Sequence, residues 1–247
     1  MQRDASKSGP ARRVLLALLL ACVAPAWAQG NDAYARQRQA LVAELRRANP
    51  LAVQTRIDPA VLEVLARVPR HEFVPEAQRR HAYENRPLAI GHGQTISQPY
   101  IVALMTSLVR PAPGQKILEV GTGSGYQAAV LAEAGASVYS VEIIEPLARQ
   151  AAQRLRVLGY RNVQTRIGDG YYGWKEHAPY DAIVVTAAAS SIPPPLIAQL
   201  KPGGRMVIPV GSSFFTQTLM LVEKRADGRV RTRQLLPVQF VPLTGEH

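Results

Sequence analysis

Apolar residues recur every three or four positions in the first third of the chain, a spacing typical of amphipathic helices. Leu41, Val42 and Leu45 illustrate it in the first of these segments. Asp58-Pro59 opens the next one, since aspartate is a good N-cap and proline suits a first helical turn. A stretch rich in glycine and proline separates the second segment from the third and predicts an irregular loop. The predicted helices cover residues 34–48, 58–68 and 99–109, and the loop covers residues 81–98.

The pattern changes to alternating strands and helices from Lys116 onward. This alternation is typical of a parallel sheet with helices on both faces. No helix is expected between the last two strands, which flank Asp227-Gly228 and should form an antiparallel edge. The sequence therefore predicts an α/β fold: a doubly wound, mostly parallel, Rossmann-like sheet with antiparallel edge strands and N-terminal helices. The expected strands cover residues 117–120, 137–141, 163–167, 180–186, 206–210, 218–223 and 235–240, and the helices among them cover residues 126–133, 146–158 and 196–200.

The first 28 residues have the pattern of a targeting segment. Basic residues precede an apolar run from Val14 to Val23, and Ala26-Trp27-Ala28 places small residues where a signal peptidase reads. Arg12-Arg13 also resembles a twin-arginine signal. The alternative is a start codon assigned too far upstream. We expect residues 1–28 to be a signal peptide or an N-terminal extension.

Composition excludes several classes of protein. A single cysteine rules out an intramolecular disulfide framework and a cysteine-based zinc site, and the five histidines show no metal-binding spacing. No apolar run reaches the roughly 18 residues of a membrane span. The net charge of +11 suggests an acidic partner, but the arginines are scattered. Arg229, Arg231 and Arg233 would share one face of a strand, which we interpret as a solvated surface rather than a nucleic-acid stripe.

A glycine-rich loop follows the first strand of the alternating region. Gly121, Gly123 and Gly125 give a tight turn that lets a ligand lie against backbone amides at the start of a helix. The loop has no lysine or arginine, so it is not a P-loop. Its spacing is GxGxG rather than GxGxxG, but alone it also fits dinucleotide binding.

Three carboxylates accompany the glycine loop. Glu119 lies in the first strand, and Glu142 ends the second, where an acid can accept both hydroxyls of a ribose. Asp169 follows the third strand and precedes Gly170, so a base could bind there against the backbone. Carboxylates around a phosphate-free loop suit a cationic ligand such as S-adenosylmethionine. In the alternative interpretation, Glu142 caps a helix and Asp169-Gly170 is only a turn.

Longer motifs resemble those of the protein-L-isoaspartate O-methyltransferases, a family of class I S-adenosylmethionine-dependent methyltransferases. The similarity runs from about residue 58 to residue 244. The segment QTISQPY at residues 94–100 is specific to that family, whereas the glycine loop is common to methyltransferases. The other segments that carry the resemblance are VPRHEFVP at 68–75, PLAIGHG at 87–93, LEVGTGSGY at 118–126, GDG at 168–170, PYDAI at 179–183, LKPGGR at 200–205 and FVPL at 240–243.

The resemblance implies a donor, an acceptor and a set of site residues. The donor is S-adenosylmethionine, and the acceptor is the α-carboxylate that an isoaspartyl linkage exposes in damaged proteins, whose repair methylation would initiate. Ser97 falls at the position of the family's active-site serine, although its local sequence also suits an N-cap for the helix near Pro99. The implied cofactor site comprises Gln94, Thr95, Ile96, Ser97, Glu119, Gly121, Gly123, Glu142, Asp169, Gly170 and Thr244, and the implied substrate site comprises Ser97, Val241, Pro242 and Leu243.

Other methyltransferase classes fit the sequence less well. A cytosine C5 enzyme needs a nucleophilic cysteine, and Cys22 lies in the leader. An exocyclic-amine enzyme needs polar acceptors after the fourth strand, where residues 186–189 are Thr-Ala-Ala-Ala. The alternatives that stay open are a methyltransferase acting on RNA or a small molecule, and a non-catalytic S-adenosylmethionine-binding protein.

The expected organisation is one compact unit after the leader. Residues 29–110 should supply the N-terminal helices and the loop that covers the site, and residues 111–247 the S-adenosylmethionine-binding catalytic domain. We expect a monomer without a metal, a nucleic-acid partner or a stable membrane association. The methyl donor is made in the cytosol, so we expect a cytoplasmic protein. The alternative is a periplasmic protein exported through the leader ending at Ala28.

Overall fold

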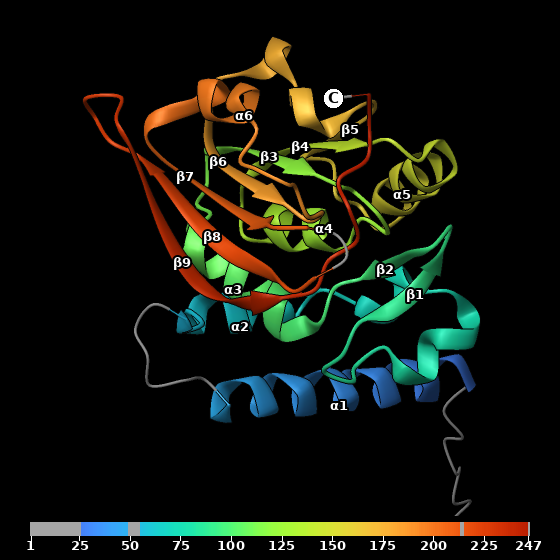
Figure 1. The fold of residues 1–247 in the computed structure, drawn as a ribbon. Helices are drawn as coiled ribbons and strands as arrows, with labels where there is room; N and C mark the ends of the chain where they lie inside the picture. The colour runs from blue at the N-terminus through green and yellow to red at the C-terminus, as the bar shows by residue number, and fades with distance from the viewer. Residues whose placement is uncertain (1–25, 49–54, 213–214, 247) are drawn as a thin grey trace, which may run out of the picture.

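The computed structural model describes residues 26–48, 55–212 and 215–246, with side chains from residue 33 onward. Within these ranges a seven-stranded sheet lies above a layer of N-terminal helices (Figure 1). The predicted leader falls outside the described residues, apart from residues 26–28 at the start of the first helix.

The large sheet is doubly wound, as the sequence predicts. Its strands follow the order β5-β4-β3-β6-β7-β8-β9, in which β3 to β7 run parallel and β8 and β9 form an antiparallel edge. The strand order turns between β3 and β6, and ligands of such sheets bind beyond the carboxyl ends of the strands at this point. The strands are β3 (Lys116–Val120), β4 (Ser137–Glu142), β5 (Val163–Ile167), β6 (Tyr180–Val185), β7 (Leu200–Val210), β8 (Gln217–Lys224) and β9 (Val230–Val238).

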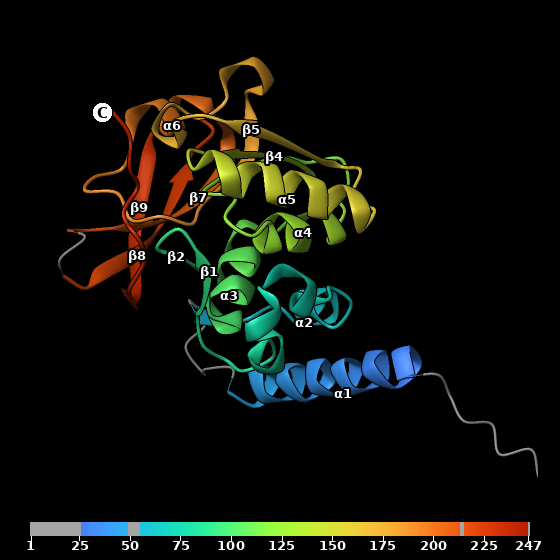
Figure 2. The same ribbon diagram turned by 90° about the vertical axis from the view of Figure 1, so that its right-hand side faces the viewer.

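Helices cover both faces of this sheet because the side chains of a strand alternate between its faces. Ile117 belongs to the apolar core beneath one set of helices, whereas Leu118 packs with Leu196 in a separate core on the other face. Figure 2 shows α3, α4 and α5 on one side and α6 on the other. These helices are α3 (Pro99–Val109), α4 (Tyr126–Glu133), α5 (Glu145–Val157) and α6 (Pro194–Gln199), with the short 3₁₀ turns η4 (Gly170–Tyr172) and η5 (Lys175–His177) near α6.

The N-terminal layer packs against the helical face. Helix α1 lies on the outside of the molecule in both ribbon views, with Leu45 fully buried and the Tyr34 ring stacked on His71 at 4.1 Å (Figures 1 and 2). Asp58 caps α2 as predicted, because its Oδ1 accepts a hydrogen bond of 2.8 Å from the Ala60 amide. The layer consists of α1 (Ala26–Arg47), α2 (Pro59–Leu65), η2 (Arg70–Phe73) and η3 (Glu76–His81).

The loop predicted over residues 81–98 is wrong for its second half, which forms an antiparallel hairpin of β1 (Leu88–Gly91) and β2 (Gln94–Ile96). These strands are too short for an alternating pattern to stand out. Their turn, from Gly91 to Gly93, has positive φ at all three residues, which the two glycines adopt readily. The hairpin brings Gln94 to Ser97 over the glycine loop.

The strand expected over residues 206–210 begins earlier than predicted, because residues 200–205 also belong to β7. Leu200 pairs with Tyr180 and Arg205 pairs with Ala182, so the intervening residues form an irregular bulge in the strand. Among the described residues, no helix combines the length and the apolar character that crossing a membrane requires.

Candidate active site

The candidate site lies beyond the carboxyl ends of β3, β4 and β6. The hairpin β1–β2 borders it on one side, and the segment after β9 runs past the strand ends on the other (Figure 1). This segment is held to the end of β6 by two hydrogen bonds of 2.8 Å: the Ala188 amide donates to the Val241 carbonyl, and the Leu243 amide donates to the Ala188 carbonyl. The site therefore combines residues from distant parts of the sequence.

The glycine loop is fixed against the end of β6. Gly121 has a φ of +92°, and a Cβ there would collide with Oγ1 of Thr186. That hydroxyl donates to the Gly121 carbonyl at 2.6 Å and to the Val120 carbonyl at 3.0 Å. Glycine is thus required at position 121 both by the backbone conformation and by the close approach of Thr186.

Glu142 bonds the backbone at two places and also lines the cleft. It is buried at the end of β4, where its Oε2 accepts a hydrogen bond of 2.8 Å from the Gly123 amide. Its Oε1 accepts one of 2.9 Å from the Ile144 amide, at the start of α5. Glu142 therefore holds the loop and the helix start, yet it also lines the cleft, and each oxygen keeps a further acceptor direction.

Glu119 is fully buried beneath the loop and does not line the cleft. Its Oε2 accepts a hydrogen bond from the Ser140 hydroxyl, which lies 2.5 Å from Oγ1 of Thr122. Its Oε1 has no partner among the described residues. Burial, together with the nearby Glu142 charge, raises the pKa of Glu119 to about 8. In this structure Glu119 supports the loop from below, and its contact with a cofactor stays a prediction.

Asp169 caps a turn, as the alternative interpretation held. Its Oδ1 accepts a hydrogen bond of 2.9 Å from the Tyr171 amide at the start of η4. Gly170, rather than Asp169, lines the cleft, and it packs so closely on Val120 that a Cβ would collide. Of the three carboxylates, Glu142 lines the cleft, and the cofactor contacts of Glu119 and Asp169 stay predictions.

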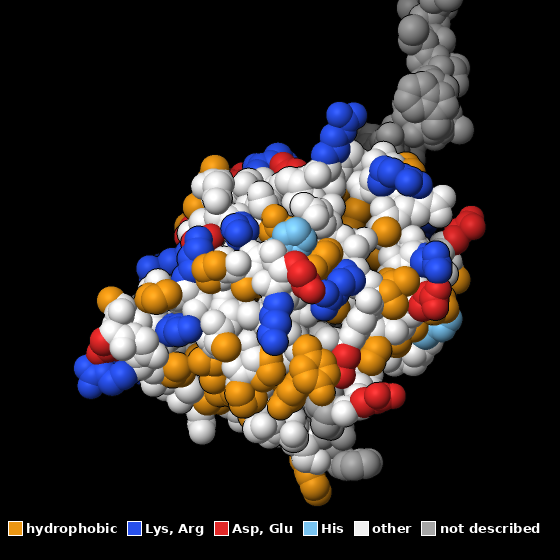
Figure 3. Space-filling view, turned by 90° about the horizontal axis from the view of Figure 1, so that it is seen from above, with side chains coloured by type: hydrophobic (Ala, Val, Ile, Leu, Met, Phe, Trp, Pro, Cys, Tyr) orange, Lys and Arg blue, Asp and Glu red, His pale blue; other side chains and the backbone are white. Residues whose placement is uncertain are grey.

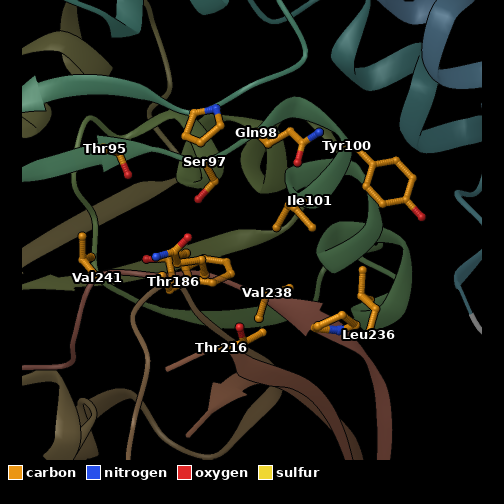
Figure 4. Close-up of a pocket in the computed structure, with 14 residues that line it drawn as sticks. Thr95, Ser97, Gln98, Tyr100, Ile101, Thr186, Thr216, Leu236, Val238 and Val241 are labelled. Carbon is orange, nitrogen blue, oxygen red and sulfur yellow. The ribbon is translucent and has the colours of Figure 1, made fainter. Parts of the chain in front are cut away.

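Two adjoining cavities make up the site. The first, a narrow cofactor-side cleft, has one carboxylate and, among the described residues, no Lys, Arg or His in its lining. The second, the acceptor cavity, has a volume of about 720 Å³ and no charged side chain among the described residues that line it. Thr95, Thr186 and Val241 line both cavities. The acceptor cavity is lined by Pro87, Thr95, Ser97, Gln98, Tyr100, Ile101, Thr186, Thr216, Leu236, Pro237, Val238, Gln239, Phe240 and Val241 (Figure 4).

Ser97 lies on the turn between β2 and α3, and Figure 4 shows its side chain directed into the acceptor cavity on the side of Thr186. The capping alternative for this serine is wrong. Gln98 occupies the N-cap position of α3, and no side chain of the cap residue bonds the helix. The Ser97 hydroxyl makes no hydrogen bond with any described residue, so it is available to a ligand.

The remaining predicted residues fall around these cavities. Gln94, Gly121, Gly123 and Thr244 line the cofactor-side cleft, and Ile96 lines a small pocket between β2 and the glycine loop. Val241 faces both cavities, but the other two predicted substrate residues, Pro242 and Leu243, line only the cofactor side.

Sequence reasoning missed part of the acceptor cavity. Thr186 could have been found, since it directly follows a buried parallel strand, where ligand-binding residues commonly lie. The apolar residues of the cavity wall carry no comparable signal, because their spacing is that of an ordinary core. The missed residues are Pro87, Gln98, Tyr100, Ile101, Thr186, Thr216, Leu236, Pro237, Val238, Gln239 and Phe240.

Neither a metal site nor a basic surface stripe accompanies the candidate site among the described residues. In the described part of the chain, no group of three or more His, Cys, Asp or Glu side chains is placed to hold a metal ion. On the face in Figure 3, Lys and Arg side chains are scattered among apolar and uncharged surface rather than gathered in a stripe.

Comparison with protein families gives one match over most of the chain. Residues 36–247 match the family model described as protein-L-isoaspartate(D-aspartate) O-methyltransferase (PCMT). Protein-L-isoaspartate O-methyltransferase 1 of Cupriavidus necator is 62% identical over 245 residues, which cover 96% of this chain and 95% of that protein. Protein-L-isoaspartate O-methyltransferase 2 of Polaromonas sp. is 71% identical over 190 residues, or 77% and 90% of the two chains.

Solved structures resemble the fold. A protein-L-isoaspartate O-methyltransferase superposes with a TM-score of 0.76 at 30% identity, covering 84% of this chain and 66% of that one. A Plasmodium falciparum beta-aspartate methyltransferase (PCMT), in complex with S-adenosyl-L-homocysteine, has a TM-score of 0.70 at 25% identity and covers 84% and 98% of the two chains.

Proposed function

Because this chain belongs to the protein-L-isoaspartate(D-aspartate) O-methyltransferase family, we propose that its acceptor cavity receives the α-carboxylate exposed by an isoaspartyl linkage, with Ser97 as the catalytic residue. The chain is an S-adenosylmethionine-dependent protein carboxyl methyltransferase. The observation that carries the proposal is the position of Ser97, whose free hydroxyl lies in a charge-free cavity that shares Thr95, Thr186 and Val241 with the cofactor-side cleft.

The donor set of the cofactor-side cleft fits S-adenosylmethionine. That cofactor carries a sulfonium and an ammonium but no phosphate, and the described lining of the cleft offers a carboxylate but no cationic side chain. In this proposal Glu142 holds the ribose, Gly121 and Gly123 pass close to the methionine portion, and Gly170 leaves room for the base. Gln94, Thr95, Ile96 and Thr244 cover the bound molecule.

The chemistry asks little of the protein in proton transfer. Bound S-adenosylmethionine supplies a methyl group activated by the positive sulfur. The acceptor carboxylate is already ionised near neutral pH and needs no general base. We infer that Ser97 donates a hydrogen bond to one carboxylate oxygen and leaves the other free to attack. Ser97 thereby places the nucleophile, which is the contribution expected from orientation.

The lining of the acceptor cavity supports the same step by excluding water. Ile101, Leu236 and Val238 are apolar, and a carboxylate placed among them loses part of its hydration. A poorly hydrated carboxylate oxygen is the more reactive nucleophile. The cavity wall is therefore proposed to contribute to rate as well as to binding.

The organisation of the chain in this proposal follows the sequence. Residues 29–110 supply the hairpin that covers the site, and residues 111–247 supply the cofactor-binding sheet, so one chain carries every proposed site residue. We propose that the enzyme acts as a monomer in the cytoplasm, where its methyl donor is made. Mass analysis of the native N-terminus tests the location, since a protein beginning at residue 29 would contradict it.

A paired-peptide assay tests the proposed function. Purified protein is incubated with labelled S-adenosylmethionine and either an isoaspartyl peptide or its aspartyl twin. We expect methylation of the isoaspartyl peptide and almost none of the twin. Only in the isoaspartyl peptide does the backbone run through the side-chain carboxyl carbon, which leaves the α-carboxylate free as a side group. Equal labelling of both peptides would refute the acceptor assignment.

A further inference from the structure

The first turn of α3 is capped from a distant part of the chain. Helix α3 begins at Pro99, and the cap residue Gln98 makes no side-chain hydrogen bond to it. The Tyr100 amide, one of the first donors of the helix, instead donates to Oδ1 of Asn85 at 3.0 Å. A helix start normally obtains this acceptor from a serine, threonine, aspartate or asparagine at its own N-cap.

Asn85 is joined to this turn by a second hydrogen bond. Nε2 of Gln98 donates to the Asn85 carbonyl at 3.0 Å, so Asn85 holds the turn on both sides of Pro99. Its Nδ2 donates to Oε1 of Glu44 on α1 at 3.3 Å. Asn85 thus links the N-terminal layer to the turn that carries Ser97.

This arrangement explains why the Ser97 hydroxyl is free. A serine just before a helix is an ordinary capping residue, and the Tyr100 amide is the kind of donor that it would satisfy. Asn85 already satisfies that amide, so Ser97 keeps its hydroxyl for the acceptor cavity. We propose that Asn85 is a positioning residue for methyl transfer, which acts by capping α3 in place of Ser97; this rests on the proposed function of Ser97.

A double-mutant cycle tests this role with an isoaspartyl peptide as acceptor. Ser97→Ala should lower kcat by about 10- to 100-fold, the range for losing a hydrogen bond to a charged group. Asn85→Ala should lower kcat by about 5- to 10-fold, with the Kd for S-adenosylmethionine changed less than about twofold. In the Ser97→Ala background, Asn85→Ala should have almost no further effect on kcat, since residues that act as a unit are not additive.

Two controls separate the cap from the remaining contacts of Asn85. Glu44→Ala removes only the exposed partner on α1 and should leave kcat unchanged. Asn85→Asp in that background keeps an oxygen facing the Tyr100 amide. Unlike Asn85→Ala, it should therefore leave kcat within about twofold of that of the Glu44→Ala protein. Failure of this aspartate variant to restore kcat would argue against the cap.

The unaltered protein offers a check that does not depend on a variant folding. The Tyr100 amide donates a hydrogen bond to Asn85. Its hydrogen should therefore exchange with deuterium more slowly than is usual for an amide in the first turn of a helix. Rapid exchange, or effects of the two substitutions that multiply in the cycle, would overturn the proposal. Absence of any methylation by the unaltered protein would instead count against the proposed function itself.

Discussion

The three glycines of the loop look equivalent in sequence but have different surroundings. A Cβ on Gly123 would meet only Cδ1 of Ile90, at 3.5 Å, which is ordinary contact. On Gly125 it would press on Cδ1 of Leu155 at 3.2 Å, and that side chain can move. On Gly121 it would strike the Thr186 hydroxyl, which is itself held by two carbonyls. Gly121 is therefore the least replaceable of the three.

Gly121→Ala should cost more stability than a glycine substitution that adds backbone strain alone. Gly159 gives the matched control, since its φ of +85° is similar and no atom lies within 4 Å of a Cβ placed there. Gly159→Ala should cost about 1–2 kcal/mol of unfolding free energy. Gly121→Ala should cost clearly more and also weaken cofactor binding. Urea unfolding and calorimetric titration measure both; equal losses for the two variants would contradict the steric argument.

The carboxylates show what residue-level reading can and cannot place. The sequence locates Glu119, Glu142 and Asp169 near strand ends, but a cofactor contact also depends on where each side chain points. Glu119 shares the strand face of Ile117, under the helices, because side chains on a strand alternate. Its direction follows from period two alone, whereas the sequence offered the turn at Asp169 only as one of two alternatives.

At the scale of elements, the sequence predicts the alternating strands and helices of the large sheet well. Helix α4 and strand β5 have the predicted bounds, and the antiparallel edge is confirmed. The hairpin β1–β2 was missed because its strands of four and three residues lie among glycine and proline residues, which predict a loop. It closes over the glycine loop, so the missed element is one that builds the site.

The contact between β3 and β4 predicts a pH dependence of stability. Glu119 of β3 accepts from Ser140 of β4, and burial raises its pKa to about 8 from an ordinary 4.5. Between these values the folded chain retains a proton that the unfolded chain releases. The contribution of Glu119 is therefore most favourable below about pH 4.5 and is lost as the pH rises towards 8.

Glu119→Gln isolates this contribution, since glutamine does not titrate. The free energy of unfolding of the unaltered protein should fall, relative to that of the variant, by on the order of a few kcal/mol between about pH 5 and pH 8. Urea unfolding of both proteins across that range measures the difference. A constant gap between the two curves would mean that Glu119 stays ionised in the folded chain.

At the scale of the molecule, the acceptor cavity depends on contacts that no local pattern encodes. The cavity is lined by residues from three places: Pro87 just before β1, Tyr100 on α3, and Leu236 and Phe240 at and after the end of β9. The sequence predicted α3 and the last strand but not that they lie side by side. The chain turns towards the strand ends after β9, where Gln217 Oε1 accepts a hydrogen bond from the Phe240 amide. A hydrogen bond between a side chain and a backbone amide 23 residues apart leaves no periodic pattern in the sequence.

The composition of this cavity predicts the peptides that the enzyme accepts best. Its volume of about 720 Å³ exceeds what one isoaspartyl residue fills, so the flanking side chains enter as well. The lining offers them apolar contact and no charged partner, and burying an unpaired charge is costly. A peptide with leucine on both sides of the isoaspartate should therefore have a KM at least about tenfold lower than one with glutamate there.

Steady-state assays at saturating S-adenosylmethionine compare the KM values of the two peptides. A third peptide, flanked by uncharged glutamine and expected to have a KM between the other two, distinguishes the loss of apolar contact from the cost of burying a charge. Equal KM values for all three peptides would place the flanking residues outside the cavity.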